Sequence, residues 1–194
     1  MDYPSISMSS PSSNTRKISL LSVLAALCLA LQLSPRPPNV EFTSFFTFII
    51  GLAYGVLAGS LFGCFVMFVN AFLSPYGYAG MIMPFQMVGM AIPGIIGGVY
   101  GRHMPDRSAP TSFCLETGVM GALSALIFDL ITNVGSGLWY VSSGVDFGLA
   151  ILTALAYGTF FSIIHIASNA AVFGMLTLPS VKVLTALAGV KEIG

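Results

Sequence analysis

Ionisable and amide side chains are rare within the long apolar stretches of this chain, and several of them stand near the ends of the stretches. Asp129 and Asn133 are four residues apart, so they share one face of a helix. Glu41, Asn70 and Gln86 each stand at the edge of a different apolar stretch. Polar groups at membrane depth face a protein interior or a watery cavity. If these edges lie on one side of a membrane, the side chains would form a ligand pocket open to that side.

No arrangement of residues typical of a catalytic site is present. The sequence has no HExxH, GxSxG or GxxxxGK[ST] motif, so it offers no support for hydrolase or ATPase chemistry. The cysteines at 28, 64 and 114 lack the CxxC spacing of a metal site, and we interpret them as core residues. His165 and Asn169 share a helix face, but no acid or base is near them in sequence, which favours helix packing. We predict neither an enzyme nor a bound metal or cofactor.

Composition places the chain in a lipid bilayer. Hydrophobic residues make up 56% of the 194 residues and charged residues only 7%, with a mean hydropathy of +0.91. A helix of about 20 apolar residues crosses the hydrocarbon core, and helices satisfy their own backbone groups there. We therefore predict an all-α integral membrane protein. Because the net charge is zero and no long basic stretch occurs, we expect no nucleic-acid partner.

The number of membrane spans depends on residues 43–73, which could form one strongly tilted helix or two short ones. Glycines at 51, 55, 59 and 63 fit either a close-packing face or a tight reversal. With two helices there, all basic residues except Arg36 lie on the side of the N-terminus, as the positive-inside rule requires of the cytoplasmic side. We therefore predict six transmembrane helices with cytoplasmic N- and C-termini, at 18–34, 43–57, 59–73, 84–100, 115–133 and 147–176.

This topology defines the domains and the location of the pocket. Residues 1–17 are predicted to be a flexible cytoplasmic tail, residues 18–176 the membrane domain, and residues 177–194 a cytoplasmic segment of a multi-pass protein of the cell membrane. The loops 35–42 and 134–146 would lie outside, beside the polar residues described above. Asp146 is well placed to cap the last span.

Several of these residues also have a structural interpretation. Glu41 could stand in the first turn of a helix, where a negative charge meets the helix dipole favourably. Asn70 and Gln86 could form hydrogen bonds between helices. Trp139, in an outer loop, could belong to an interfacial aromatic belt or could stack on a ligand ring. Asp129 is the strongest functional candidate, because a carboxylate within a span needs a compensating partner.

Small residues recur along the first predicted span. Ser22, Ala26 and Ala30 are spaced four apart and form one stripe. Small side chains allow another helix to approach closely in lipid. The stripe could pack within this protein or against another subunit, and the spacing does not distinguish the two.

Several motifs resemble the substrate-binding S components of energy-coupling factor (ECF) vitamin transporters. Ala26-x-x-x-Ala30 is similar to the docking motif on the first helix of that family. The resemblance extends from about residue 20 to 135. Its other parts are the loop Pro38-Asn39-Val40-Glu41-Phe42-Thr43, the segment Gly51-Leu52-Ala53-Tyr54-Gly55 with Gly59, and Pro84-Phe85-Gln86-Met87 with Gly94, Gly97 and Gly98.

The resemblance implies a six-helix S component that binds a vitamin or related micronutrient in an outward pocket. It implies that Ser22, Ala26 and Ala30 dock on an ECF transmembrane coupling subunit, and that two separate ABC-type ATPases use ATP to drive uptake. Candidate substrate-binding residues are Asn39, Glu41, Asn70, Gln86, Asp129, Asn133 and Trp139. An alternative is a stand-alone secondary transporter of a small solute in which Asp129 and His165 couple transport to protons.

Overall fold

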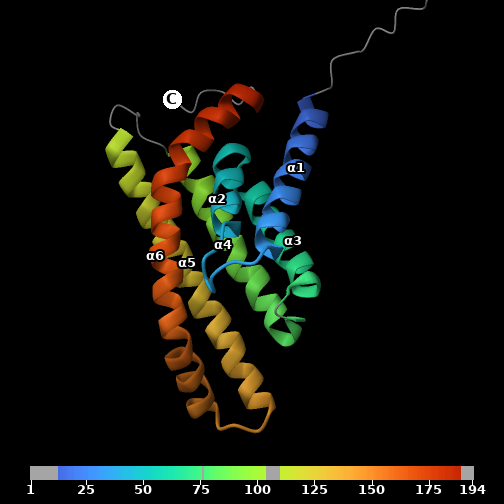
Figure 1. Cartoon of the computed structure of the whole chain (residues 1–194), viewed down its shortest axis with the longest axis vertical. Helices are drawn as coiled ribbons and strands as arrows, with labels where there is room; N and C mark the ends of the chain where they lie inside the picture. The colour runs from blue at the N-terminus through green and yellow to red at the C-terminus, as the bar shows by residue number, and fades with distance from the viewer. Residues whose placement is uncertain (1–12, 76, 104–109, 189–194) are drawn as a thin grey trace, which may run out of the picture.

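The computed structural model describes residues 13–75, 77–103 and 110–188, and in these ranges the chain is helical with short connections (Figure 1). Residues 1–12 of the predicted tail and residues 189–194 of the predicted C-terminal segment lie outside the described residues. The elements are α1 (Ser13–Leu33), α2 (Thr43–Tyr54), α3 (Val56–Leu73), the 3₁₀ turn η1 (Gly80–Ile82), α4 (Met83–Arg102), α5 (Pro110–Ser142) and α6 (Phe147–Ala188).

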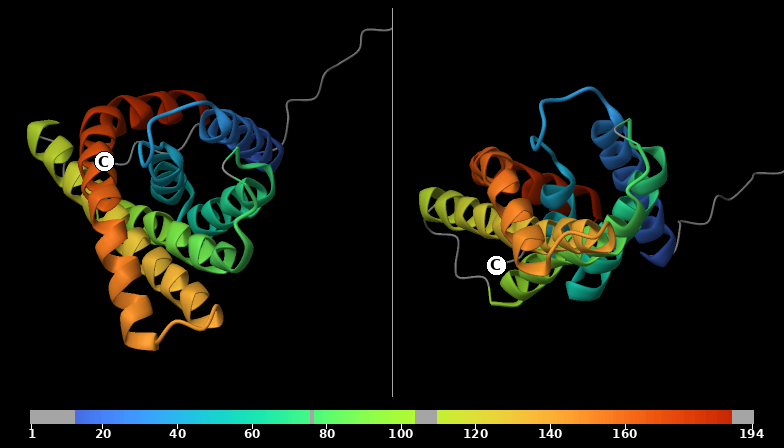
Figure 2. Two further views of the ribbon diagram at one scale, coloured as in Figure 1. Left: turned by 60° about the horizontal axis from the view of Figure 1, so that its bottom comes forward. Right: turned by 90° about the horizontal axis from the view of Figure 1, so that it is seen from below.

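Five of the described helices, all except α2, are long and apolar enough to cross a membrane. The prediction of an all-helical, multi-pass membrane protein is therefore confirmed. With 12 residues, α2 spans about 18 Å, which is less than the thickness of a hydrocarbon core. It is nevertheless the central helix, because most of its residues are buried and the other helices surround it (Figure 2).

The stretch 43–73 forms two helices that reverse direction at Gly55. This residue has φ 90° and ψ 170°, a conformation that only glycine adopts readily. Its amide donates to the carbonyl oxygen of Gly51, which closes α2, and α3 begins at the next residue. The reversal therefore needs no loop, and it lies slightly earlier than the predicted boundary between 57 and 59.

Glycines bring the backbones of α2, α3 and α4 into direct contact. A Cβ atom added to Gly51 would overlap the carbonyl oxygen of Gly94, and one added to Gly94 would overlap the backbone at Gly59. A Cβ on Gly59 would lie 2.6 Å from the Cα atom of Gly51. Such close approach is a main source of association between helices in lipid, because dispersion contacts replace the missing hydrophobic driving force. The three helices form a closely packed unit.

The first and last helices of the chain are longer than predicted. The helix α1 begins at Ser13 rather than at 18, and α6 continues to Ala188 instead of ending at 176. Pro179 lies within α6, where a proline interrupts the hydrogen-bond ladder, and the last part of α6 turns across the bundle in Figure 1. Val181 and Leu184 then pack in the core cluster that contains Phe48 of α2.

The helices alternate in direction along the chain, so both ends of the described chain lie at the top of Figure 1. The described residues of three connections, 34–42, 74–75 with 77–82, and 143–146, join the helices at their opposite ends, and we call this side of the bundle the loop end. The antiparallel pair α5 and α6 extends beyond the other helices there (Figure 1). In the first turn of α6, the Asp146 carboxylate accepts a hydrogen bond from the Leu149 amide at 3.1 Å, as predicted for a cap.

Candidate ligand-binding site

The connection 34–42 folds into the body of the protein. Arg36 holds it together, since its guanidinium donates to the carbonyl oxygens of Gln32 and Val40 at 3.3 and 2.9 Å. Asn39 adopts a left-handed backbone conformation with φ 58°, which asparagine tolerates better than most residues. Its side-chain amide donates to the Phe161 carbonyl oxygen at 3.2 Å, and its own carbonyl accepts from the Ser168 hydroxyl at 3.2 Å. These contacts fix the connection to α6.

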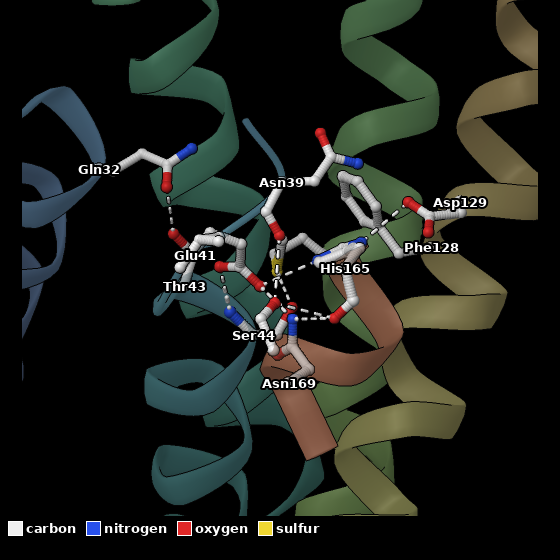
Figure 3. A network of polar contacts seen from close by, with 12 residues as sticks. Gln32, Asn39, Glu41, Thr43, Ser44, Phe128, Asp129, His165 and Asn169 are labelled. Atoms are coloured by element: carbon white, nitrogen blue, oxygen red, sulfur yellow. Dashed lines mark hydrogen bonds and ion pairs between the residues drawn. The ribbon is translucent and has the colours of Figure 1, made fainter. Parts of the chain in front are cut away.

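His165 stands between two carboxylates in the interior (Figure 3). Its Nδ1 atom lies 2.8 Å from Oδ1 of Asp129 on α5, and its Nε2 atom lies 3.2 Å from Oε1 of Glu41. All three residues are buried. The ring of Phe128 packs edge-on against the imidazole, with 5.6 Å between ring centroids. We call Glu41, Asp129 and His165 the carboxylate–histidine triad.

The two short contacts set the number of protons in the triad. Each contact needs one hydrogen between a ring nitrogen and a carboxylate oxygen, because two acceptors cannot bond to each other. The hydrogens either both reside on the imidazole, or one resides on a carboxyl group. In both arrangements the triad carries one net negative charge. Such a charge at membrane depth is costly and is typical of functional sites.

Glu41 has further partners that link the triad to α2 and α6. Its Oε2 atom accepts a hydrogen bond from the Ser44 amide at 2.9 Å, which satisfies a free donor in the first turn of α2. Its Oε1 atom also accepts from the Asn169 side-chain amide at 3.3 Å. The structural interpretation of Glu41 is confirmed, because its carboxylate stabilises the start of α2. The same carboxylate also belongs to the buried polar cluster.

A cavity of about 540 Å³ adjoins the triad at the loop end, and we call it the loop cavity. Its wall comes from the connection 34–42, the ends of α1 and α3, the segment before α4, α4 itself and single residues of α5 and α6. The lining residues are Gln32, Arg36, Pro38, Asn39, Glu41, Met67, Asn70, Ser74, Gly77, Tyr78, Ala79, Ile82, Gln86, Met90, Phe128 and His165.

A second cavity of about 320 Å³ lies mainly between α5 and α6, and we call it the hairpin cavity. It shares Asn39, Ile82, Gln86 and Phe128 with the loop cavity, so the two adjoin. Asp129 lines the hairpin cavity, while the other two members of the triad line the loop cavity. Its remaining lining residues are Thr132, Asn133, Ser136, Tyr140, Ala154, Tyr157, Gly158, Phe161 and Ser162.

Six of the seven residues predicted to bind substrate line these cavities, and one does not. The loop cavity contains Glu41 and Asn70, the hairpin cavity contains Asp129 and Asn133, and both contain Asn39 and Gln86. Trp139 lines neither cavity and is 46% exposed on α5. Its surroundings fit the alternative interpretation as an interfacial aromatic residue.

His165 and Asn169 were predicted to serve helix packing, because no acid is near them in sequence; only the alternative of a secondary transporter paired His165 with Asp129. Both belong to the buried polar cluster, since Asp129 and Glu41 are 36 and 124 residues away from His165 in sequence and contact it in the fold. The available signal was the pair itself, since two polar side chains four residues apart in an apolar span are costly to bury and need partners.

The small-residue stripe of α1 faces away from the bundle. Ser22, Ala26 and Ala30 are exposed, whereas Cys28 on the same helix is buried in a core cluster. Packing within the described part of this chain therefore does not account for the stripe.

Comparison of the chain with protein-family models, with curated proteins and with solved structures finds no match. Within the described residues, no group of three His, Cys, Asp or Glu side chains is arranged to hold a metal ion. The carboxylates of the triad lie at opposite sides of the imidazole ring and do not converge on one point. The arrangement suits an organic ligand that contacts apolar walls and a few fixed polar groups.

Proposed function

We propose that this chain is the substrate-specificity (S) component of an ECF-type ABC transporter. In this proposal it binds a vitamin or related micronutrient from outside the cell, and partner subunits drive uptake with ATP. The observation that carries the proposal is the pair of adjoining cavities at the loop end, walled by buried polar groups from α4, α5, α6 and the connection 34–42. The loop end would then face the exterior and both termini the cytoplasm.

The exposed stripe of α1 supports the partner assignment. Ser22, Ala26 and Ala30 present small side chains on a face that the rest of the described chain leaves open. A helix of a transmembrane coupling subunit could approach this face closely. By the family resemblance, two ABC-type ATPases bind that subunit, and their ATP-driven movement topples the six-helix body to release the ligand inside.

Co-expression of the tagged chain with the coupling subunit and ATPases of its source tests the proposal. The complex in proteoliposomes should take up the small molecule that co-purifies with the chain, identified by mass spectrometry, only when ATP is supplied. Ala26→Leu should abolish co-purification of the coupling subunit and leave the bound small molecule in place, because Ala26 is exposed on α1 and lines neither cavity. Ala171→Leu makes the same change at an exposed position of α6 and should have no effect.

Loss of both ligand and partner in Ala26→Leu, or loss of neither, would contradict the docking assignment. Uptake that proceeds equally with and without ATP would contradict the proposed function as a whole.

The triad favours a second candidate, a stand-alone secondary transporter that couples solute movement to protons. His165 between two carboxylates is a group that can exchange protons at membrane depth. This candidate predicts that the purified chain alone moves the co-purified molecule across proteoliposomes in response to a pH gradient. The S-component proposal predicts binding and no transport under the same conditions.

A further inference from the structure

The hairpin cavity offers hydrogen-bond acceptors in a setting that lacks basic side chains. Among its lining residues, which all lie in the described part of the chain, Asp129 is the one charged group, and no Lys or Arg is present. The hydroxyl groups of Thr132 and Ser136 donate their protons to the carbonyl oxygens of Phe128 and Thr132 at 3.0 Å each. They therefore present lone pairs to the cavity.

Two buried oxygen atoms beside this cavity have no hydrogen-bond partner among the described residues. They are Oδ2 of Asp129, whose residue is only 6% exposed, and Oε1 of Gln86. His165 occupies the other oxygen of Asp129 at 2.8 Å and so fixes the carboxylate orientation. Buried polar atoms are nearly always paired, and an unpaired carboxylate oxygen is especially costly. Both atoms are acceptors, so the missing partner carries N–H or O–H donors.

Aromatic side chains supply the remaining wall. Phe128, Tyr140, Tyr157 and Phe161 line the hairpin cavity together with the acceptors. The face of an aromatic ring attracts a cation, and the attraction strengthens where water is excluded. Carboxylate and amide oxygens combined with aromatic side chains are complementary to a positively charged nitrogen group, and the carboxylate is unfavourable for an anion.

We propose that the hairpin cavity binds a primary ammonium or amidinium group of the ligand. Oδ2 of Asp129 and Oε1 of Gln86 accept hydrogen bonds from its N–H groups. This inference rests on the proposed function, because it assigns the substrate of that site to the organic cations. The loop cavity then accommodates the rest of the molecule, since the two cavities adjoin at Asn39 and Gln86.

The test compares benzamidine with benzamide on the full chain in lipid nanodiscs, by calorimetric titration. The probes share one shape and differ in charge and in donor number. Benzamidine should bind with an affinity of about millimolar, as expected for a ligand of its size, and benzamide should bind about tenfold more weakly or not at all. Equal binding of the two probes, or no saturable binding of benzamidine, would overturn the proposal.

Substitutions locate the effect in the hairpin cavity. Asp129→Asn should remove the preference for benzamidine, whereas Asp146→Asn, at the exposed cap of α6, should retain it. Because Asp129 also supports His165, Gln86→Met provides a second variant that deletes one acceptor and keeps the length of the side chain. It should weaken benzamidine binding about threefold to tenfold. A preference that persists in Asp129→Asn, or an unchanged affinity for benzamidine in Gln86→Met, would overturn the proposal.

These measurements need no partner subunit and no ATP, so they test the cation site independently of the S-component proposal. Benzamidine preference without ATP-driven uptake would retain the cation site and reject the S-component assignment. ATP-driven uptake of a molecule that lacks a basic nitrogen would retain the S-component assignment and reject the cation site.

Discussion

The two halves of this protein differ in the kind of residue that they bury. In the unit of α2, α3 and α4, glycine backbones touch, and a methyl group added at Gly51, Gly59 or Gly94 would overlap a neighbouring helix. In the half formed by α5, α6 and the connection 34–42, charged and amide groups are buried around cavities. The carboxylate–histidine triad belongs to the second half, and Oδ2 of Asp129 has no hydrogen-bond partner among the described residues.

This difference separates scaffold from site. Close packing of small residues needs no ligand to be complete, and it holds α4, which contributes Gln86 to both cavities, in place. Buried ionisable groups at membrane depth are costly and are typical of functional sites, so the polar half is where function is expected. Variants in the two halves should therefore fail for different physical reasons.

The largest effect is expected in the polar half. His165→Ala removes the group that compensates two buried carboxylates, and breaking a buried charge pair in this way costs about 3–5 kcal/mol. SDS titration of the purified protein in mixed micelles should show this loss in the free energy of unfolding. His103→Ala alters an exposed histidine at the end of α4 and should change the free energy by less than about 0.5 kcal/mol.

A triple variant distinguishes whether the stability loss of His165→Ala comes from uncompensated charge or from lost packing. Adding Glu41→Gln and Asp129→Asn to His165→Ala removes the uncompensated charges, so a large part of the lost stability should return. If the triple variant is less stable than His165→Ala alone, the loss does not come from unpaired carboxylates, and the comparison between the halves breaks down.

A somewhat smaller effect is expected in the scaffold. Gly94→Ala places a Cβ atom against the backbone of Gly59 and Ser60, which cannot move aside as a flexible side chain can. Overpacking of this kind costs about 3 kcal/mol, measured by the same titration. Gly148→Ala is the matched control, because its Cβ would meet only the Asp146 carboxylate at 3.4 Å. Equal behaviour of the two alanine variants would show that the helices are less closely packed than described.

The smallest effect is expected at the reversal between α2 and α3. Gly55→Ala meets no atom within 4 Å, so its cost comes only from the backbone conformation at φ 90°. Such strain costs about 1–2 kcal/mol. A loss as large as that of Gly94→Ala would mean that the reversal, rather than the contact between backbones, limits the stability of the scaffold.

The sequence predicted the scaffold well, because local patterns encode it. Apolar stretches gave the helices, and the spacing of glycines in 43–73 indicated both a close-packing face and a reversal, which the structure combines. The ends of α1 and α6 were less predictable. Residues 177–188 look like a cytoplasmic segment, yet Val181 and Leu184 continue the helix because they pack against α2.

The site was predicted in part. The sequence shows that burying a polar residue is costly, but it does not show which residue of another helix will contact that residue in the fold. Asp129 was recognised as a carboxylate that needs compensation, but the compensating His165 belongs to a helix that becomes its neighbour only in the fold. Trp139 was misplaced for a related reason. It was assigned to a loop, whereas α5 continues to Ser142 and leaves this side chain exposed on a helix.

The one-residue reversal at Gly55 has a practical consequence for determining sidedness. Because α2 passes directly into α3, that end of the pair has no connecting loop to receive a protease site or an epitope insertion. Orientation must be read from positions joined by a single long helix, and α5, at about 50 Å, separates its two ends by more than a bilayer core. Cysteines introduced at the exposed positions Thr111 and Ser143 would report opposite faces of the membrane.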